Sequence, residues 1–216
     1  MTTSILRHAL ASAGILTAFA VVGTTLLAAT YLVTSPIIAE TEKQAKLALI
    51  GQILPATLHD NDLFKDSALL PPAMELGNSE PTPVYRALKD GKPSAAVLEV
   101  IAPDGYSGKI RLIVAIKTDG EVSGVRVVTH NETPGLGDYI EIAKNSWIRI
   151  FEGKSLSKFS DQDWKVKKDG GKFEHIAGAT VTPRAVVKAV HKSLKYFAAN
   201  QDNIFSLPAN AQEQAN

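Results

Sequence analysis

Residues 109–129 read KIRLIVAIKTDGEVSGVRVVT, and this stretch sets the class of the fold. Its two halves, 109–117 and 122–129, are rich in β-branched residues and flank the dipeptide Asp119-Gly120. Asp-Gly suits the positive φ angles of a type I′ turn, so the pattern predicts a β-hairpin.

Two more strand patterns precede this hairpin, at residues 84–88 and 95–101. A helical pattern follows it at residues 139–149, and a second begins near Thr182, which we expect to be the N-cap, with Pro183 in the first helical position. Because strands come early and helices late, we expect an α+β fold with a mainly antiparallel sheet and flanking helices.

An uncharged run, LASAGILTAFAVVGTTLLAATYLV, covers residues 10–33. As a helix it is about 36 Å long, which is enough to cross a hydrocarbon core of about 30 Å. A cleaved signal peptide is the alternative, but its apolar region is shorter, roughly 7–15 residues. We therefore expect one retained transmembrane helix. The charges beside the run, Arg7 before it and Lys43 and Lys46 after it, leave its orientation open.

These patterns divide the chain into four parts. The N-terminal tip and the transmembrane helix occupy residues 1–39, and a stalk helix with a proline-rich, loop-rich connection occupies 40–83. The folded domain covers 84–200. The remaining residues, 201–216, are rich in Gln, Asn and Ala, and we expect this tail to be disordered.

Charge and composition exclude several functions. The 216 residues contain 23 Lys and Arg and 22 Asp and Glu. Arg7 is the one charged side chain before Glu40, so the rest of the chain has 22 basic and 22 acidic residues and is neutral. This argues against binding to nucleic acid, which requires an excess of positive charge. The absence of cysteine excludes disulfides, thiolate nucleophiles and Cys-type zinc sites.

A first candidate motif is HNETPGLGD at residues 130–138. Gly135 and Gly137 would let the backbone approach a ligand closely, and Thr133 could supply a polar contact. Taken by itself, the segment is better explained as a Pro-Gly turn in which Asp138 caps a helix.

A second candidate is EHIAGATVTP at residues 174–183, in which small residues lead to Thr180 just before a helix. The N-terminus of a helix offers unpaired N–H groups that suit a phosphate. Taken by itself, this segment favours a capping threonine over a ligand site.

Taken together, the two segments resemble the RnfG family, the G subunits of the Rnf (or Rsx) electron-transport complex, which are related to the C subunits of the sodium-pumping NADH:quinone reductase. Residues 174–180 resemble the flavinylation motif Asp-x-x-Ser/Thr-Gly-Ala-Thr, with Glu174 in place of its Asp and Ala177 in place of its Ser/Thr. The runs ETPGLG at 132–137 and GYSG at 105–108 are similar to runs of the same family.

The resemblance implies that residues 84–200 bind FMN and that a flavin transferase attaches it covalently to Thr180 through a phosphoester. It implies no catalytic residue and no metal site. The other residues that it implies as cofactor contacts are Thr133, Pro134, Gly135, Leu136, Gly137, Gly178 and Ala179, and the transferase would recognise Glu174, Gly178 and Ala179.

The resemblance also implies a role and a location. The chain would carry electrons within a membrane-bound oxidoreductase that links ferredoxin and NAD to the transport of Na⁺ or H⁺, and it would not catalyse the overall reaction alone. Its partners would be the other subunits of the complex, and not nucleic acid. It would cross the bacterial inner membrane once, with a cytoplasmic amino terminus and a periplasmic domain. The alternative is a membrane-anchored, extracytoplasmic binding or assembly module without flavin.

Overall fold

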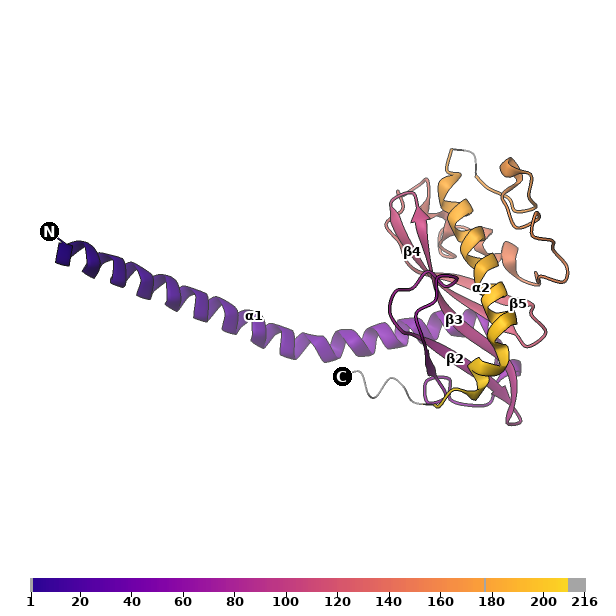
Figure 1. The fold of residues 1–216 in the computed structure, drawn as a ribbon, viewed down its shortest axis with the longest axis horizontal. Coiled ribbons are helices and arrows are strands. Elements are labelled where there is room, and N and C mark those ends of the chain that lie inside the picture. Colours follow the sequence, from indigo (N-terminus) through magenta and orange to yellow (C-terminus); the bar gives the residue numbers. More distant parts are fainter. Residues whose placement is uncertain (1, 177, 210–216) are drawn as a thin grey trace. The chain divides into compact units, whose positions relative to one another are not determined.

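The computed structural model describes residues 2–176 and 178–209, and the chain forms two compact units, Met1–Leu47 and Ala48–Asn216. The elements, in chain order, are helix α1 (Thr2–Ile53), 3₁₀ helix η1 (Ala56–Leu58), strands β1 (Ala68–Leu70), β2 (Thr82–Lys89), β3 (Lys92–Gly105), β4 (Gly108–Lys117) and β5 (Val122–Thr129), 3₁₀ helices η2 (Asp138–Ile140), η3 (Ser146–Phe151) and η4 (Lys167–Asp169), and helix α2 (Val181–Ser206) (Figure 1).

Helix α1 carries the uncharged run and continues without a break through the charged residues that follow it. The apolar side chains of residues 9–39 are exposed, with Phe19 and Leu27 at 74% and 75%. Among the described residues, this is the one helix long and apolar enough to cross a membrane. It ends at Ile53 because Pro55 disfavours helical conformation in the residue before it. The predicted long apolar helix near the amino terminus is therefore confirmed.

The five strands form one antiparallel sheet in the order β1-β2-β3-β4-β5, so each strand pairs with its neighbour in the sequence. The predicted α+β class, with one N-terminal helix before an antiparallel sheet, is therefore confirmed. Strand β1 was not predicted, because it has three residues and lies in the proline-rich connection. It pairs with β2 through Ala68 and Val84 at the edge of the sheet.

The hairpin at Asp119-Gly120 is present, but its predicted type I′ turn is wrong. Gly120 has a φ of 82° whereas Asp119 does not have a positive φ, and the Gly120 N–H donates to the Lys117 carbonyl (2.9 Å). This matches a type I turn followed by a left-handed glycine. The type I′ geometry occurs instead between β2 and β3, where Asp90 and Gly91 have φ angles of 50° and 71°.

Helix α2 packs on one face of the sheet (Figure 1). Its buried stripe of Val186, Val190, Leu194 and Phe197 follows the helical spacing of the sequence and meets the apolar side chains of β3 and β4. An aromatic cluster extends this core beneath the irregular segment before α2, with ring centroids 5.0–5.7 Å apart; its members are Trp147, Phe151, Trp164 and Phe173.

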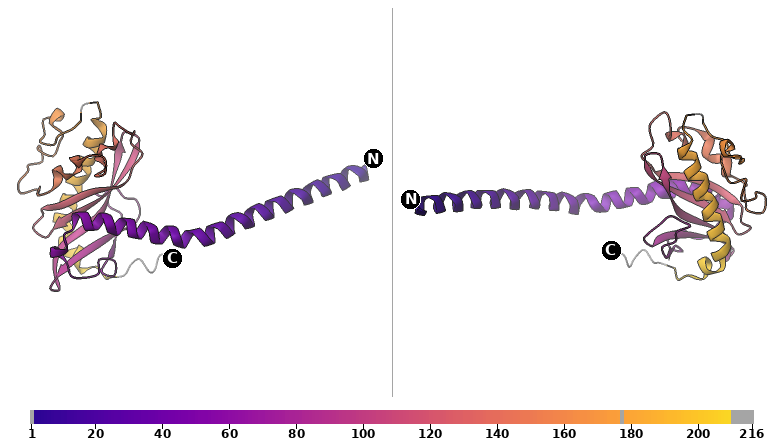
Figure 2. Two further views of the ribbon diagram at one scale, coloured as in Figure 1. Left: turned by 180° about the vertical axis from the view of Figure 1, so that it is seen from behind. Right: turned by 45° about the horizontal axis from the view of Figure 1, so that its top comes forward.

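The last turns of α1 pack on the opposite face of the sheet, as the reversed view in Figure 2 shows. Ile50 and Ile53 are fully buried there. Arg126 of β5 donates through Nε to the Gln52 side chain (2.9 Å), and the Ser123 hydroxyl donates to the Ile53 carbonyl (2.6 Å). The second of these bonds satisfies a carbonyl at the C-terminus of α1, which a helix cannot satisfy internally.

The expected helix at 139–149 is wrong. The segment forms η2 and η3 instead, because Glu141 and Asn145 between them are extended. The Asn145 side chain accepts the Trp147 N–H (2.8 Å) and so starts a new turn rather than continuing the old one.

The expected disorder of 201–216 is wrong for residues 201–206, because α2 continues to Ser206. Ile204 is fully buried there, and Arg86 of β2 donates to the Leu207 carbonyl (2.5 Å). Buried apolar area and a bonded helix end hold this polar segment in place. Residues 210–216 lie outside the described part of the chain.

A substitution at Gly124 of β5 tests the contact between the sheet and the end of α1. A Cβ at this position would lie 2.7 Å from Ile53 Cγ2 and 3.1 Å from Ile53 Cα. We expect Gly124→Val to lower the free energy of unfolding by about 1–3 kcal/mol through overpacking. Chemical denaturation of the full-length protein in detergent, followed by tryptophan fluorescence, measures this. Gly51→Ala is the control, because a Cβ there meets nothing within 4 Å and should stabilise the helix. Equal stability of Gly124→Val and wild type would contradict this packing.

Candidate functional site

A pocket of about 340 Å³ lies where three segments meet. These segments are the turn between β3 and β4, the loop that follows β5 and the start of α2. The pocket therefore brings together all three runs that the sequence analysis singled out. Its lining residues are Tyr106, Glu132, Thr133, Leu136, Gly137, Gly178, Ala179, Thr180, Val181 and Thr182.

Glu132 connects the three segments. Its side chain is buried, with the residue 4% exposed. One carboxylate oxygen, Oε1, accepts the Ser107 N–H of the β3–β4 turn (3.0 Å). The other, Oε2, accepts the hydroxyl of Thr182 in the first turn of α2. One buried carboxylate therefore joins the turn, the loop and the helix.

Two glycines make room for this carboxylate. A Cβ at Gly137 would lie 2.8 Å from Glu132 Oε2 and 3.1 Å from Thr182 Oγ1. A Cβ at Gly105 would lie 2.8 Å from Glu132 Oε1 and 2.3 Å from the Gly108 carbonyl oxygen. The close backbone approach expected at Gly137 is thus present, but it is made to side chains of this protein. Gly137 has an ordinary φ of −93°, so space rather than backbone freedom requires the glycine.

The loop that follows β5 forms one wall of the pocket and is held by its own hydrogen bonds. The Thr133 carbonyl accepts the N–H groups of Leu136 (3.1 Å) and Gly137 (3.0 Å). The Asp138 carboxylate accepts the Gly135 N–H (2.8 Å), so it bonds back into the loop instead of capping a helix. Thr133, Leu136 and Gly137 line the pocket, whereas the predicted contacts Pro134 and Gly135 belong to the same loop without lining it.

Thr180 and Thr182 differ in what their hydroxyls do. Thr182 is 1% exposed, and its hydroxyl donates to Glu132. It lies inside α2, so its predicted role as the N-cap is wrong. Thr180 takes the N-cap position but makes no side-chain capping hydrogen bond, and it lines the pocket. The Thr182 hydroxyl is therefore used by Glu132, whereas Thr180 lines the pocket without a side-chain capping bond.

The backbone before Thr180 is held by Tyr139. The Tyr139 hydroxyl donates to the Ala179 carbonyl (3.2 Å). Burial, with the nearby Glu132 charge adding to it, raises the pKa of Tyr139 to about 12, so the phenol keeps the proton that it donates. Gly178 has a φ of 91°, which a residue with a side chain adopts only with strain. Ala177 lies outside the described residues.

Glu174 does not line the pocket. Its side chain is 62% exposed and forms an ion pair with Lys167. Its carbonyl accepts the indole N–H of buried Trp147 (2.8 Å), which fixes the start of the segment that leads to Thr180. The segment from Glu174 to Thr180 thus runs from the surface to the pocket.

Two features of the pocket are compatible with the FMN that the resemblance implies. The N–H groups of Val181 and Thr182 lie in the first turn of α2, where the helix dipole favours a phosphate. Tyr106, Leu136 and Val181 are exposed by 71%, 56% and 42% and give the lining apolar area for a flat ring. Among the described lining residues, Glu132 carries the one charge, and both of its oxygens already accept hydrogen bonds.

Sequence reasoning missed Glu132, Tyr106 and Tyr139 as parts of this site. Glu132 and Tyr106 stood in the quoted runs ETPGLG and GYSG, which was the available signal. Nothing in those runs shows that the carboxylate is buried or that Tyr139 reaches across to Ala179, because both depend on residues distant in the sequence.

Comparisons with known proteins agree with this geometry. The FMN-binding domain family matches residues 105–195, which contain all three pocket segments. The RnfG N-terminal region matches residues 1–53, which contain α1.

Several relatives are similar over nearly the whole chain, and each is named as the G subunit of an ion-translocating oxidoreductase complex. The protein from Shewanella baltica is 48% identical over 198 residues, covering 92% of this chain and 93% of the relative. The protein from Shewanella loihica is 45% identical, covering 96% and 98%, and that from Pseudomonas aeruginosa is 46% identical, covering 94% and 93%. The chain therefore belongs to the RnfG family, the G subunits of ion-translocating oxidoreductase complexes, and carries an FMN-binding domain.

Proposed function

We propose that this chain is the electron-carrying subunit of its complex and that it holds FMN covalently, through a phosphoester to Thr180. The observation that supports the proposal is the place of Thr180. The residue lines the pocket at the start of α2 and makes no side-chain capping bond, whereas the hydroxyl of nearby Thr182 donates to Glu132.

In this proposal the chain's own groups bind and orient the cofactor. The first-turn N–H groups of α2 bind the phosphate, and the side chains of Tyr106, Leu136 and Val181 cover the ring against water. Thr133, Gly137, Gly178 and Ala179 give the remaining contacts, and Pro134 and Gly135 shape the loop. When bound, FMN supplies the electron transfer, and the protein supplies position and electrostatics.

Attachment of the flavin requires access by a flavin transferase. Glu174 and Gly178 are exposed and Ala179 is half-buried, so these three residues are accessible from solvent. We propose that the transferase recognises these three residues. The Thr180 oxygen would bond to the phosphorus of the FMN half of a flavin dinucleotide such as FAD. The P–O–P anhydride bond of that donor would break, nucleoside monophosphate would leave, and the hydroxyl proton would pass to a base of the transferase.

The electron path and the location complete the proposal. Electrons linked to ferredoxin and NAD would pass through this chain and the other subunits of the complex, coupled to transport of Na⁺ or H⁺. Helix α1 would cross the inner membrane once, with the amino terminus in the cytoplasm and the FMN-binding domain in the periplasm. The match to an FMN-binding domain disfavours the alternative of a binding or assembly module without flavin.

The attachment site is tested by a matched pair of variants. We expect Thr180→Ala, co-expressed with a flavin transferase, to lose flavin fluorescence of the protein band in a denaturing gel. Thr182→Val should keep the fluorescence, because it removes a hydroxyl that serves Glu132 and leaves Thr180 intact. Intact mass should show one FMN on wild type and none on Thr180→Ala. A fluorescent Thr180→Ala band would sink the assignment.

The topology is tested by cysteine labelling, because the natural chain has no cysteine. Lys92→Cys places a thiol on the exposed β2–β3 turn, and Thr3→Cys places one near the amino terminus. We expect a membrane-impermeant thiol reagent to label Lys92→Cys, and not Thr3→Cys, in cells with a permeabilised outer membrane. Lysed cells are the control, in which both should react. The opposite labelling pattern, or a mature chain that begins in the twenties or thirties, would refute the proposed topology.

A further inference from the structure

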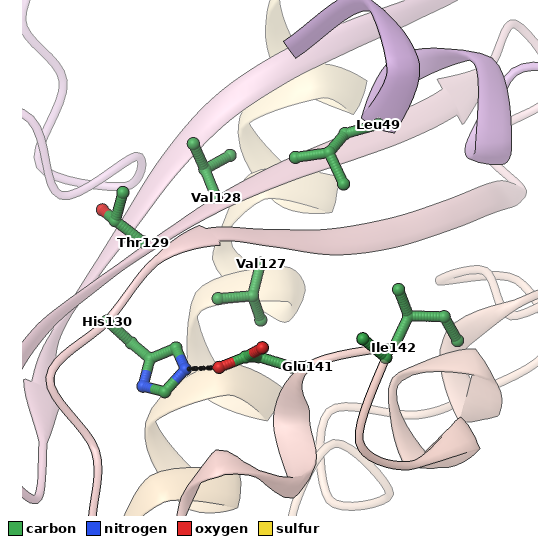
Figure 3. Close-up of a pocket in the computed structure, with 8 residues that line it drawn as sticks. Leu49, Val127, Val128, Thr129, His130, Glu141 and Ile142 are labelled. Carbon is green, nitrogen blue, oxygen red and sulfur yellow. Dashed lines mark hydrogen bonds and ion pairs between the residues drawn. The ribbon is translucent and has the colours of Figure 1, made fainter. Parts of the chain in front are cut away.

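A second cavity, of about 390 Å³, lies beside the C-terminal end of β5. Figure 3 shows its lining residues, of which five are apolar and three, Thr129, His130 and Glu141, are polar, and two of the polar side chains form a pair. In that pair, His130 Nε2 lies 2.6 Å from Glu141 Oε1. The lining residues are Leu49, Val127, Val128, Thr129, His130, Glu141, Ile142 and Ala143.

The hydrogen bonds of His130 determine its tautomer. The Glu132 N–H donates to His130 Nδ1 (2.9 Å), so Nδ1 must be without a hydrogen. In the neutral ring Nε2 therefore carries the hydrogen and donates it to the Glu141 carboxylate. Both ring nitrogens of this side chain, whose exposure is 9%, are thus used.

The His130 ring takes the place of a backbone partner for Glu132. Strand β5 ends at Thr129, and in the described part of the chain no backbone–backbone hydrogen bond outside helices and strands involves residues 130–132. The Glu132 N–H instead donates to the His130 side chain, which itself donates to Glu141. Glu141 is fixed by its own N–H, which donates to the Asp138 carbonyl (3.0 Å).

These bonds form a continuous series from the second cavity to the proposed flavin pocket. Glu141 orients His130, His130 fixes the Glu132 backbone, and the Glu132 carboxylate joins Ser107 and Thr182. The series includes a backbone amide, which does not readily pass a proton. Its action is therefore through position and not through proton transfer.

We propose that His130, oriented by Glu141, is a positioning residue of the flavin pocket. It aligns the Glu132 carboxylate so that the β3–β4 turn and the first turn of α2 are held at opposite ends of one side chain. The role in flavin orientation rests on the proposed function, whereas the effect on Glu132 and Ser107 does not require a bound cofactor.

Matched variants separate the two hydrogen bonds. His130→Asn keeps an acceptor near the position of Nδ1 and loses the reach to Glu141. His130→Gln reaches toward Glu141 but lacks the acceptor for the Glu132 N–H. Glu141→Gln keeps an acceptor for Nε2 and serves as the conservative control, and Glu141→Leu removes it.

The measurement is amide hydrogen exchange of the full-length protein in detergent, read in peptides that cover residues 130–137 and 103–109. In a flavin-free Thr180→Val background, we expect His130→Gln to speed exchange roughly tenfold in both peptides, since a lost hydrogen bond changes local opening by about this factor. Glu141→Gln and His130→Asn should remain closer to wild type than His130→Gln.

The flavinylated protein gives the second readout. His130→Gln should weaken the visible circular dichroism of the attached flavin and shift its midpoint potential, while in-gel fluorescence stays, because attachment depends on Thr180. If His130→Gln does not fold, the comparison of Glu141→Leu with Glu141→Gln decides in its place, with faster exchange expected in the first alone.

Two results would overturn the proposal. One is exchange within twofold of wild type in both peptides of folded His130→Gln. The other is faster exchange confined to 130–137, with residues 103–109 and the flavin dichroism unchanged. If wild type carries no covalent flavin, the proposed function fails, and the exchange comparison still decides the positioning role.

Discussion

The pocket depends on one buried carboxylate, that of Glu132. A charge removed from water is costly unless it is hydrogen-bonded, and here each oxygen has a donor, the Ser107 N–H or the Thr182 hydroxyl. The same carboxylate also restricts its neighbours, because a Cβ at Gly105 or Gly137 would lie too close to one of its oxygens. Gly137, which the resemblance implies as a cofactor contact, therefore serves first to leave room for a side chain of the protein.

The sheet topology explains why these segments meet. Strands β3 and β4 close a hairpin at Gly105 and Gly108, and β5 runs back along β4 so that Thr129 pairs with Arg111 near the same end. The turn and the loop after β5 therefore lie together without any long connection. Nearer the start of β5, Gly124 packs against Ile53 at the end of α1, and Arg126 donates a hydrogen bond to Gln52. One strand thus contacts the last turns of α1 and leads into the loop that forms the pocket wall.

Much of this fold could be predicted because it follows from patterns in short stretches of the sequence. The long apolar helix, four of the five strands and α2 follow from hydrophobic spacing, and Thr180 follows from a motif. Features set by distant contacts could not be predicted. The Asn145 side chain accepts the Trp147 N–H and so starts a new turn. Burial of Ile204 keeps the end of α2 helical. The Thr182 hydroxyl donates to Glu132, fifty residues away, instead of capping the helix.

The two threonines at the start of α2 show how a helix separates structural and chemical roles. Successive helical residues are rotated by about 100°, so Thr180 and Thr182, two positions apart, point about 200° apart. Thr180 has near-helical backbone angles, with φ −92° and ψ −23°, so this relation applies to it. The two hydroxyls are therefore not directed at the same acceptor, and the one that donates to Glu132 belongs to Thr182. The Thr182 hydroxyl joins the pocket segments through Glu132, and Thr180, which lines the pocket without a capping bond, is the residue for which we propose the phosphoester.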